Sequence, residues 1–506
     1  MSRKKKLFLN SSLGLVKQLV LVVCGFILPR YMLLYYGSDV NGLVSSITHF
    51  LGFISLLEMG IGPVVQASLY KPLADKNNVE ISKVVISAER FFRTIAKVFL
   101  GYIAVLCFVF PIFVNSQFSP IYTISLLIII SISSLAQYFF GATYQLLLNA
   151  DQKAYIQISL QIITVLLNTI LCIVFMKIGA SIHIVRLVTA FVYVLRPLGQ
   201  MLYVRKHYKL NKKLVLTEEP IKQKWNGFSQ HLAAVITGNA DVVILTLFAT
   251  LASVSIYSVY YNVVYGVTSI ALTAATGLEA FFGNMLAKNE TETLNKSFQV
   301  VEWFTHFAVT LLFTVTFITI TPFISVYTKG VTDANYIAPA FGHMLTLAYA
   351  AECLRIPYFR MIKAAGHFKQ TQNGAFISAG INIVISITLV FKFGLIGIAF
   401  GTLAAMLYHT CYFVWYLRKN IIYRQGKYYL KYLLTDVVVG GISYIIFRNL
   451  TLRVLSYMEW VRTAIIVFAI VLAVALPVYI SMNLKQFKLL VKELSSVTNR
   501  MKKHSE

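Results

Sequence analysis

Two consecutive apolar runs near the start of the chain decide its fold class. Residues 12–35 read SLGLVKQLVLVVCGFILPRYMLLY, and residues 42–70 read GLVSSITHFLGFISLLEMGIGPVVQASLY. Each run is longer than the roughly 20 residues with which a helix spans the hydrocarbon core of a bilayer. The polar segment 37–41 (GSDVN) separates the runs and is expected to be a hinge. The stretch therefore predicts a hairpin of two membrane-spanning helices.

Three charged residues interrupt this hairpin. Lys17 and Arg30 lie inside the first run, and Glu58 lies near the middle of the second. A charge at membrane depth costs about 3 kcal/mol on insertion scales, so it is expected to face a protein interior or a water-filled cavity. Lys17 and Arg30 are close enough to the ends of their run to reach the interface instead. The hairpin is expected to form the wall of a polar path.

The composition extends this conclusion to the whole chain. Of its 506 residues, 58% are hydrophobic and only 13% are charged, with a mean hydropathy of +0.72. A soluble domain carries about 25% charged residues, so the chain is predicted to be a polytopic membrane protein. The net charge of +26 would suggest nucleic acid in a soluble protein. In a membrane protein such an excess belongs to cytoplasmic loops near anionic lipid, and no nucleic-acid partner is expected.

The sequence carries no signature of a cofactor or of an enzyme. The five cysteines lie inside apolar runs without metal-ligand spacing, and the nine histidines are scattered. The phosphate-binding pattern of a P-loop does not occur. The loops expected outside the membrane are short, whereas a membrane polymerase or glycosyltransferase usually displays a sizeable outer loop. We therefore expect no metal, no cofactor and no catalytic residues.

Fourteen apolar segments predict fourteen transmembrane helices. If the N-terminus lies inside, most of the 45 Lys and Arg fall on the cytoplasmic side, which predicts that both termini are cytoplasmic. The residues from Lys485 onward have the pattern of a basic amphipathic helix on the inner surface. The segments are 12–35, 42–69, 94–115, 121–148, 154–176, 181–204, 228–249, 254–284, 301–327, 337–362, 371–391, 394–417, 432–448 and 463–483.

An internal repeat relates the first six segments to the next six at an offset of about 214 residues. Because six spans is an even number, both copies keep the same orientation, and a pseudo-two-fold axis along the membrane normal is expected, with a site at the interface of the copies. We predict an all-α protein with two pseudo-symmetric six-helix lobes, 1–215 and 216–420, and with 421–506 holding two further spans and a cytoplasmic tail. The matches are Glu89-Arg90-Phe91 with Glu302-Trp303-Phe304, Pro111 with Pro322, and Tyr144–Leu148 with Tyr358–Ile362.

Two arginines in the sixth segment are the strongest candidates for binding an anion. Arg186 lies near the outer end of the segment, and Arg196 lies deeper and precedes Pro197. Ten residues correspond to about 80° around a helix, so the two side chains can share one broad face at two depths. Shifted by the repeat they fall on Gly401 and Cys411, so the fold itself does not require these charges. Arg196 is expected to be the main anchor for an anionic substrate.

Deep acids are the candidates for ion coupling or gating. Glu58 and Asp241 fall in different lobes, and desolvation of a buried carboxyl moves its proton affinity toward a useful range. Glu352 and Arg355 are three residues apart and can neutralise each other on one helix face. The alternatives are that the acids are structural and that Arg196 pairs with Glu58 or caps carbonyls freed at Pro197. The candidate substrate-binding residues are Arg196, Arg186, Arg30, Lys17 and Arg355, and the candidate coupling residues are Glu58, Asp241 and Glu352.

Several motifs resemble those of Wzx-type lipid-linked oligosaccharide flippases. Residues 38–43 (SDVNGL) followed by 56–62 (LLEMGIG) resemble the second-span signature of these polysaccharide transporters. Asp241 with residues 256–258 (IYS) resembles the matching part of the second half, and residues 364–369 (AAGHFK) resemble the loop after span ten. The family belongs to the multidrug/oligosaccharidyl-lipid/polysaccharide (MOP) exporters, which also include multidrug extruders and lipid II flippases.

The resemblance implies a V-shaped arrangement of two lobes that opens alternately to each side of a bacterial plasma membrane. It implies an undecaprenyl-pyrophosphate-linked oligosaccharide as substrate, as in Gram-positive teichoic-acid or capsule synthesis, with H⁺ or Na⁺ as a coupling ion. A polymerase or ligase of the same pathway is an implied partner. The negative pyrophosphate needs cationic groups at depth, which agrees with the arginines of the first half.

Four rival functions are compared with the sequence. An organic-cation antiporter needs a net acidic cavity, whereas the first half offers three Arg and one Lys against Glu58. A lipid II flippase of the same superfamily fits the same charges. The loop from Lys71 to Lys76 lacks the signature that a major facilitator carries after its second span. A scaffold without transport activity would have no use for buried charges.

Overall fold

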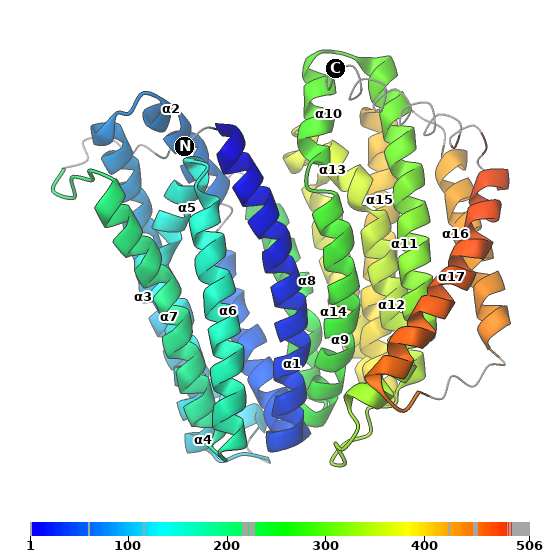
Figure 1. Cartoon of the computed structure of the whole chain (residues 1–506), viewed down its shortest axis with the longest axis horizontal. Coiled ribbons are helices and arrows are strands. Elements are labelled where there is room, and N and C mark those ends of the chain that lie inside the picture. The colour runs from blue at the N-terminus through cyan, green and yellow to red at the C-terminus, as the bar shows by residue number, and fades with distance from the viewer. Residues whose placement is uncertain are drawn as a thin grey trace. The chain divides into compact units, whose positions relative to one another are not determined.

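The computed structural model consists of helices connected by short loops (Figure 1). It describes residues 3–58, 61–114, 117–214, 221, 228–423, 426–448, 454–482, 484 and 487, and this part of the chain contains no strand. The elements are α1 (Arg3–Gly52), η1 (Phe53–Glu58), α2 (Ile61–Ala74), α3 (Asn78–Val114), α4 (Pro120–Ala136), η2 (Gln137–Gly141), α5 (Ala142–Ala150), α6 (Ala154–Lys177), α7 (Ile182–His207), α8 (Phe228–Phe248), α9 (Leu251–Ala274), α10 (Leu278–Ala287), α11 (Thr291–Tyr327), α12 (Pro339–Leu354), α13 (Ile356–Ala364), α14 (Phe368–Phe393), α15 (Leu395–Asn420), α16 (Lys427–Phe447) and α17 (Tyr457–Met482).

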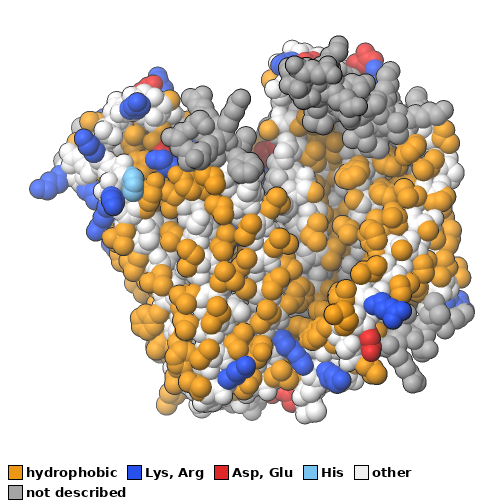
Figure 2. Space-filling model, in the orientation of Figure 1, with side chains coloured by type: hydrophobic (Ala, Val, Ile, Leu, Met, Phe, Trp, Pro, Cys, Tyr) orange, Lys and Arg blue, Asp and Glu red, His pale blue; other side chains and the backbone are white. Residues whose placement is uncertain are grey.

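The predicted all-α membrane fold is confirmed. In the described residues, 11 continuous helical stretches are long and apolar enough to cross a bilayer. The first of them, Leu9–Glu58, holds two of the predicted spans, α8 supplies a shorter apolar span, and segment 337–362 divides into α12 and α13. All fourteen predicted segments therefore fall on helices. On the face shown in Figure 2, apolar side chains cover the middle of the molecule, and Lys and Arg lie toward its ends, as a bilayer requires.

The predicted hinge between the first two spans is a kink at a single residue. Gly37 has φ +79° and ψ 179°, a conformation that glycine adopts without steric cost, and α1 continues on both sides of it. The carboxylate of Asp333 accepts hydrogen bonds from the backbone N–H of Ser38 at 2.6 Å and from its Oγ at 2.8 Å. Asp333 therefore caps the helical turn that the kink leaves open. The second predicted run is itself interrupted by η1, a 3₁₀ turn that ends at Glu58.

By its contacts the chain divides into two compact units. Unit 1 comprises Met1–Ser258 and Gly330–Ala334, and unit 2 comprises Val259–Lys329 and Asn335–Glu506. Within unit 1, α1 packs on α6 and α8, α6 on α7, and α7 on α4. Within unit 2, α15 packs on α12 and α14, and α11 packs on α12, α16 and α17. The lobe boundaries read from the sequence, at 215 and 420, stay a prediction.

The internal repeat is reproduced in the helices of the two units. The helices α3 and α11 each have 37 residues, α5 and α13 each have nine, and α7 and α15 each have 26. A side-chain contact is also repeated. Tyr144 donates to Glu89 at 2.7 Å in unit 1, and Tyr358 donates to Glu302 at 2.5 Å in unit 2. These are the pairs that the sequence matches bring into correspondence.

Two predicted features fall largely outside the described residues. The amphipathic helix expected from Lys485 onward lies there, except for Phe487. Most of the loop 205–227 lies there as well. The described part of the loop comprises residues 205–214 and 221, and in it Lys212 donates to Glu89 at 2.7 Å.

Candidate functional site

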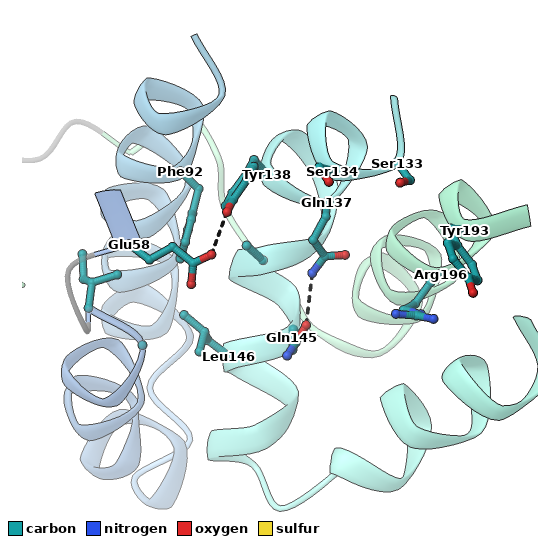
Figure 3. A pocket seen from close by; sticks show the side chains of 13 residues that line it. Glu58, Phe92, Ser133, Ser134, Gln137, Tyr138, Gln145, Leu146, Tyr193 and Arg196 are labelled. Carbon is teal, nitrogen blue, oxygen red and sulfur yellow. Dashed lines mark hydrogen bonds between the residues drawn. The ribbon is translucent and has the colours of Figure 1, made fainter. Parts of the chain in front are cut away.

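A cavity of about 380 Å³ lies inside unit 1 (Figure 3). Its wall is built by η1, α2, α3, α4, η2, α5 and α7, so it sits where the helices of this unit converge. The lining residues are Glu58, Ile61, Gly62, Phe92, Ser133, Ser134, Gln137, Tyr138, Ala142, Gln145, Leu146, Tyr193 and Arg196. Most of these side chains are polar, although the spans that supply them are apolar.

A local irregularity in the fourth span shapes this wall. Residues Gln137–Gly141 form a turn of π-helix between α4 and α5, a feature that is rare and often found at functional sites. A Cβ on Gly141 would lie 2.7 Å from the Cβ of Pro197, so the glycine lets α7 approach this turn closely. The contact sets the position of Arg196, the residue before Pro197, in the cavity wall.

The acid of the cavity has a neutral partner. Glu58 accepts a hydrogen bond from Tyr138 Oη at 2.7 Å. Gln137 donates from Nε2 to Oε1 of Gln145 at 3.0 Å, and in Figure 3 these two amides lie between Glu58 and Arg196. In the described part of the chain no ion pair joins Glu58 to Arg196.

Arg196 is held by a hydroxyl and an aromatic ring. Its Nη2 donates to Oγ1 of Thr164 at 3.1 Å, and its guanidinium lies 5.3 Å from the centre of the Tyr193 ring. Its Nε is buried and has no hydrogen-bond partner among the described residues. The helix α7 runs through Pro197 without a break, and among the described residues Arg196 makes no hydrogen bond to a backbone carbonyl. Arg196 therefore keeps donor capacity inside the protein, where an unused donor is costly.

A second cavity of about 370 Å³ adjoins the first and contains Arg186. The two cavities share Ser133, Ser134, Tyr138 and Tyr193 in their walls. Arg186 Nη2 lies 2.8 Å from the thioether sulfur of Met32, a weak acceptor, and its Nε is buried with no hydrogen-bond partner in the described residues. No acidic side chain lines this cavity in the part of unit 1 that the structure describes.

The structure thus brings together three of the eight predicted site residues. Arg186, Arg196 and Glu58 line two adjoining cavities, with two permanent positive charges against one carboxylate. Guanidinium groups bind phosphate through paired, charge-assisted hydrogen bonds. Serine, glutamine and tyrosine side chains add neutral donors and acceptors that suit hydroxyl groups. The arrangement is suited to an anion that carries a polar, uncharged extension.

Comparison with known proteins shows which solved structures share this architecture. No family model and no curated protein matches the chain. Among solved structures, lipid II flippase MurJ in an inward closed conformation superposes with a TM-score of 0.71 at 18% identity, covering 96% of this chain and 100% of that one. An inward-facing MATE family transporter of the MOP superfamily gives 0.64 at 11% identity, covering 82% and 99%. This chain has the fold of MurJ and the MATE transporters.

The solved structures that share this fold are described as a flippase and as multidrug transporters. A third structure, of a mutant of the MATE transporter VcmN from Vibrio cholerae, agrees with a TM-score of 0.58 at 13% identity over 83% of this chain and 98% of that one. At such identities the likeness extends to the fold. The substrate has to be argued from the residues of this chain.

Two of the predicted cations lie elsewhere in unit 1. Lys17 and Arg30 are half-buried on α1, and neither is among the residues that line the two cavities. Asp241 on α8 is 4% exposed and accepts a hydrogen bond from Tyr257 Oη at 2.8 Å, also away from both cavities. The roles proposed for these three residues stay predictions.

The remaining pair belongs to unit 2. Arg355 stands at the break between α12 and α13, and its Nη2 lies 3.3 Å from Oε1 of Glu352. Its Nη1 lies 2.6 Å from Nδ1 of His409. Glu352 and Arg355 therefore form the ion pair that their spacing allows, and Arg355 has a carboxylate partner that Arg186 and Arg196 lack among the described residues.

The sequence analysis missed the neutral half of the site. Gln137, Gln145, Tyr138 and Tyr193 were not singled out, because amides and tyrosines in apolar spans usually pack against other helices. A weak signal existed: the fourth segment contains Ser133, Ser134 and both glutamines within 13 residues, an unusual polar density for a lipid-facing helix.

Proposed function

We propose that this protein is a flippase that moves an undecaprenyl-pyrophosphate-linked oligosaccharide from the inner to the outer leaflet by alternating access. The oligosaccharide is the repeat unit of a cell-surface polysaccharide such as teichoic acid or capsule. The polyprenyl tail stays in the lipid while the head group passes through the polar interior.

One observation carries this proposal: Arg186 and Arg196 line adjoining cavities, and each has a buried Nε–H without a hydrogen-bond partner in the described residues. A buried guanidinium with an unpaired N–H donor is unfavourable unless a ligand accepts a hydrogen bond from it. A pyrophosphate supplies several anionic oxygens, which are the acceptors that two guanidinium groups at different depths require.

The neutral wall supports a sugar as the rest of the head group. Ser133, Ser134, Gln137 and Gln145 present hydroxyl and amide groups, and Phe92 and Tyr193 present apolar ring faces. Sugars offer hydroxyl groups along their edges and C–H groups on their faces. The lining therefore complements an uncharged glycan attached to the pyrophosphate.

The rival functions differ in charge and in head group. An organic-cation antiporter requires a net acidic cavity, and the described walls carry two arginines and one glutamate. A lipid II flippase is favoured by the superposition on MurJ and shares the pyrophosphate. The two pyrophosphate substrates differ in the peptide that lipid II carries.

Binding by the purified, full-length protein tests the proposal. Undecaprenyl pyrophosphate is expected to bind, and undecaprenol, which has the same tail and no phosphate, is expected to bind much more weakly. Arg186→Ala and Arg196→Ala should each weaken binding of the pyrophosphate about tenfold or more, as expected for loss of a charge-assisted hydrogen bond. The matched control is Arg205→Ala, which removes an exposed arginine from the end of the same helix.

Equal binding of undecaprenol and its pyrophosphate would refute the proposal, as would saturable binding of a lipophilic organic cation that depends on Glu58. A second comparison separates the two flippase substrates. Undecaprenyl-pyrophosphate-linked glycan without peptide should compete for the site as well as lipid II or better. A strict requirement for the peptide would assign the protein to lipid II instead.

A further inference from the structure

A buried cluster of titratable groups lies in unit 2, where three helices meet. Asp436 of α16 is contacted by His306 and Thr310 of α11 and by Tyr479 of α17. His306 Nδ1 lies 2.7 Å from Oδ2 of Asp436, and Thr310 Oγ1 donates to Oδ1 at 2.8 Å. The Tyr479 hydroxyl also donates to Oδ1. The cluster belongs to neither cavity of unit 1 and includes none of the residues assigned to the substrate.

The hydrogen bonds define where the protons are. Thr310 and Tyr479 both donate to the same carboxylate oxygen, so Oδ1 of Asp436 acts as an acceptor. The carboxylate then accepts from the Nδ1–H of His306, which leaves Nε2 as the unprotonated ring nitrogen. That Nε2 is buried and has no hydrogen-bond partner among the described residues, and the His306 side chain is 0% exposed. The imidazole thus holds one vacant basic nitrogen in the interior.

The net charge of the cluster favours the binding of a proton at Nε2 of His306. With neutral His306 the cluster carries one net negative charge, and in the described chain no Lys or Arg forms an ion pair with Asp436. Uptake of one proton at Nε2 gives an imidazolium–carboxylate pair with no net charge. Because a buried net charge is far more costly than a buried neutral pair, the cluster has a physical reason to bind one proton.

The groups around His306 also favour a proton on its ring. Glu302, one helical turn earlier on α11, is a second buried carboxyl and accepts from Tyr358 of α13. From α16, the Tyr429 ring lies 5.8 Å and the Tyr432 ring 5.1 Å from the imidazole, and α17 contributes Tyr479. The described titratable neighbours are therefore acids or phenols, and a proton on His306 meets no positive charge among them.

We propose that His306 and Asp436 form a proton-binding site in unit 2 whose occupancy is coupled to transport. The step is the transfer of one proton from water to the Nε2 lone pair, which breaks no bond in the protein. The proton changes the charge at the point where α16 and α17 are attached to α11. The coupling, though not the binding of the proton, rests on the proposed transport function.

Nuclear magnetic resonance of the full-length protein with ¹⁵N-labelled histidine tests the site. One imidazole is expected to change from the neutral to the doubly protonated pattern as the pH of the sample is lowered. His306→Asn assigns that signal by removing it, and the amide keeps a donor toward Asp436 without binding a proton. Asp436→Asn should shift the titration or abolish it. A His306 signal that stays in one form at every pH at which the protein remains folded overturns the proposal.

The pH profile of transport tests the coupling. His306→Asn should fold and accumulate but lose the pH dependence that the wild type shows. Thr310→Val is the matched control, because it removes one hydrogen bond to Asp436 and leaves the titrating group in place, so its profile should keep the wild-type shape. An unchanged profile in His306→Asn would refute the coupling. Failure of the pyrophosphate-binding test would instead refute the transported substrate and leave the titration as it stands.

Discussion

Asn41 on α1 donates a hydrogen bond at 2.8 Å to Ser255 on α9, the residue that follows it by 214 positions. One helical turn further on, the hydroxyls of Ser45 and Ser258 lie 2.7 Å apart, and these residues are 213 positions apart. Both separations equal the offset of the internal repeat. Each residue is therefore hydrogen-bonded to the residue that corresponds to it in the repeat, and all four residues belong to unit 1.

Small side chains make this pairing possible. Between Asn41 and Ser45, a Cβ on Gly42 would collide with the carbonyl oxygen of Leu251. Thr246 of α8 adds a hydrogen bond to Ser46 at 2.7 Å. Membrane helices approach closely where glycine and serine line the contact. Hydrogen bonds between such neutral groups are weak enough to break and re-form with other partners.

A cysteine cross-link tests this contact. In a variant without the five native cysteines, Ser45→Cys with Ser258→Cys is expected to form a disulfide under mild oxidation, because the two hydroxyl oxygens are hydrogen-bonded at 2.7 Å. Ser45→Cys with Ser253→Cys, which lies on another face of α9, is the control and should not cross-link. Gel mobility after cleavage of the chain in the 205–227 loop reports the result. Equal cross-linking of both pairs would contradict the predicted pairing.

Hydropathy and the spacing of residues were sufficient to predict the helices and the internal repeat. The fourteen apolar segments fall on helices because the bilayer imposes both their length and their composition. The repeat was readable because Glu89 with Tyr144 and Glu302 with Tyr358 are kept as pairs. Arg186, Arg196 and Glu58 were also found from sequence, since a charge inside an apolar run is conspicuous.

The rest of the site depends on tertiary packing that leaves no local signal. The π-helical turn at Gln137–Gly141 has no known sequence signature, yet it shapes one cavity wall. Asp436 and His306 are 130 positions apart, and nothing near either residue indicates that they meet. Whether Arg355 is neutralised by Glu352 also depended on rotamers that spacing alone does not determine.

Arg196 is expected to be more sensitive to its hydrogen-bonding geometry than to its charge alone. Arg196→Lys keeps the charge and loses the paired donors, and Arg196→Ala loses both, so we expect a graded loss of export with normal protein levels. The alanine variant should fall by about tenfold or more. Export is measured as outer-leaflet oligosaccharide in cells, with Arg205→Ala as the control. Full export by Arg196→Ala, or loss explained by absence of the protein, would contradict the anchor role.

Glu58 is expected to influence the ion dependence of transport. It lines the cavity and accepts from Tyr138, whereas Asp241 is buried away from the cavity and accepts from Tyr257. Glu58→Gln should change the pH or Na⁺ dependence of transport, and Tyr138→Phe should separate the effect of the hydrogen bond from that of the charge. If Glu58→Gln and Asp241→Asn both leave transport and its ion dependence unchanged, neither acid takes part in coupling.

The orientation of the chain is predicted to place α7's C-terminal end in the cytoplasm. Lys209 and Lys329 are exposed in loops that the alternation of spans assigns to opposite sides. In intact cells, a membrane-impermeant maleimide should label Lys329→Cys and spare Lys209→Cys until the cells are opened. Labelling of Lys209→Cys from outside would reverse the predicted topology.

Asp151 is expected to hold the start of α1 against the turn between α5 and α6. Its carboxylate lies 3.2 Å from Lys6 Nζ and 2.7 Å from Lys153 Nζ, and it accepts from Tyr208 at 2.5 Å. Burial alone would raise the pKa of Asp151, but the hydrogen bonds from Lys153, Tyr208 and Lys6 outweigh it and hold the pKa below the ordinary value of 3.8. Folding therefore favours the ionised carboxylate.

The sign of the pH dependence follows from this lowered pKa. The stabilisation by Asp151 is complete above the ordinary carboxyl pKa of 3.8 and is lost as the pH falls below it, through the lower pKa of the folded state. Asp151→Asn should reduce the free energy of unfolding by about 1–3 kcal/mol at neutral pH. The difference from the wild type should shrink in acid. Thermal unfolding in detergent at several pH values measures it. Glu292→Gln is the control, because the Glu292–Lys296 pair is exposed and should contribute nothing measurable. Equal effects of the two substitutions at neutral pH would contradict the role of Asp151.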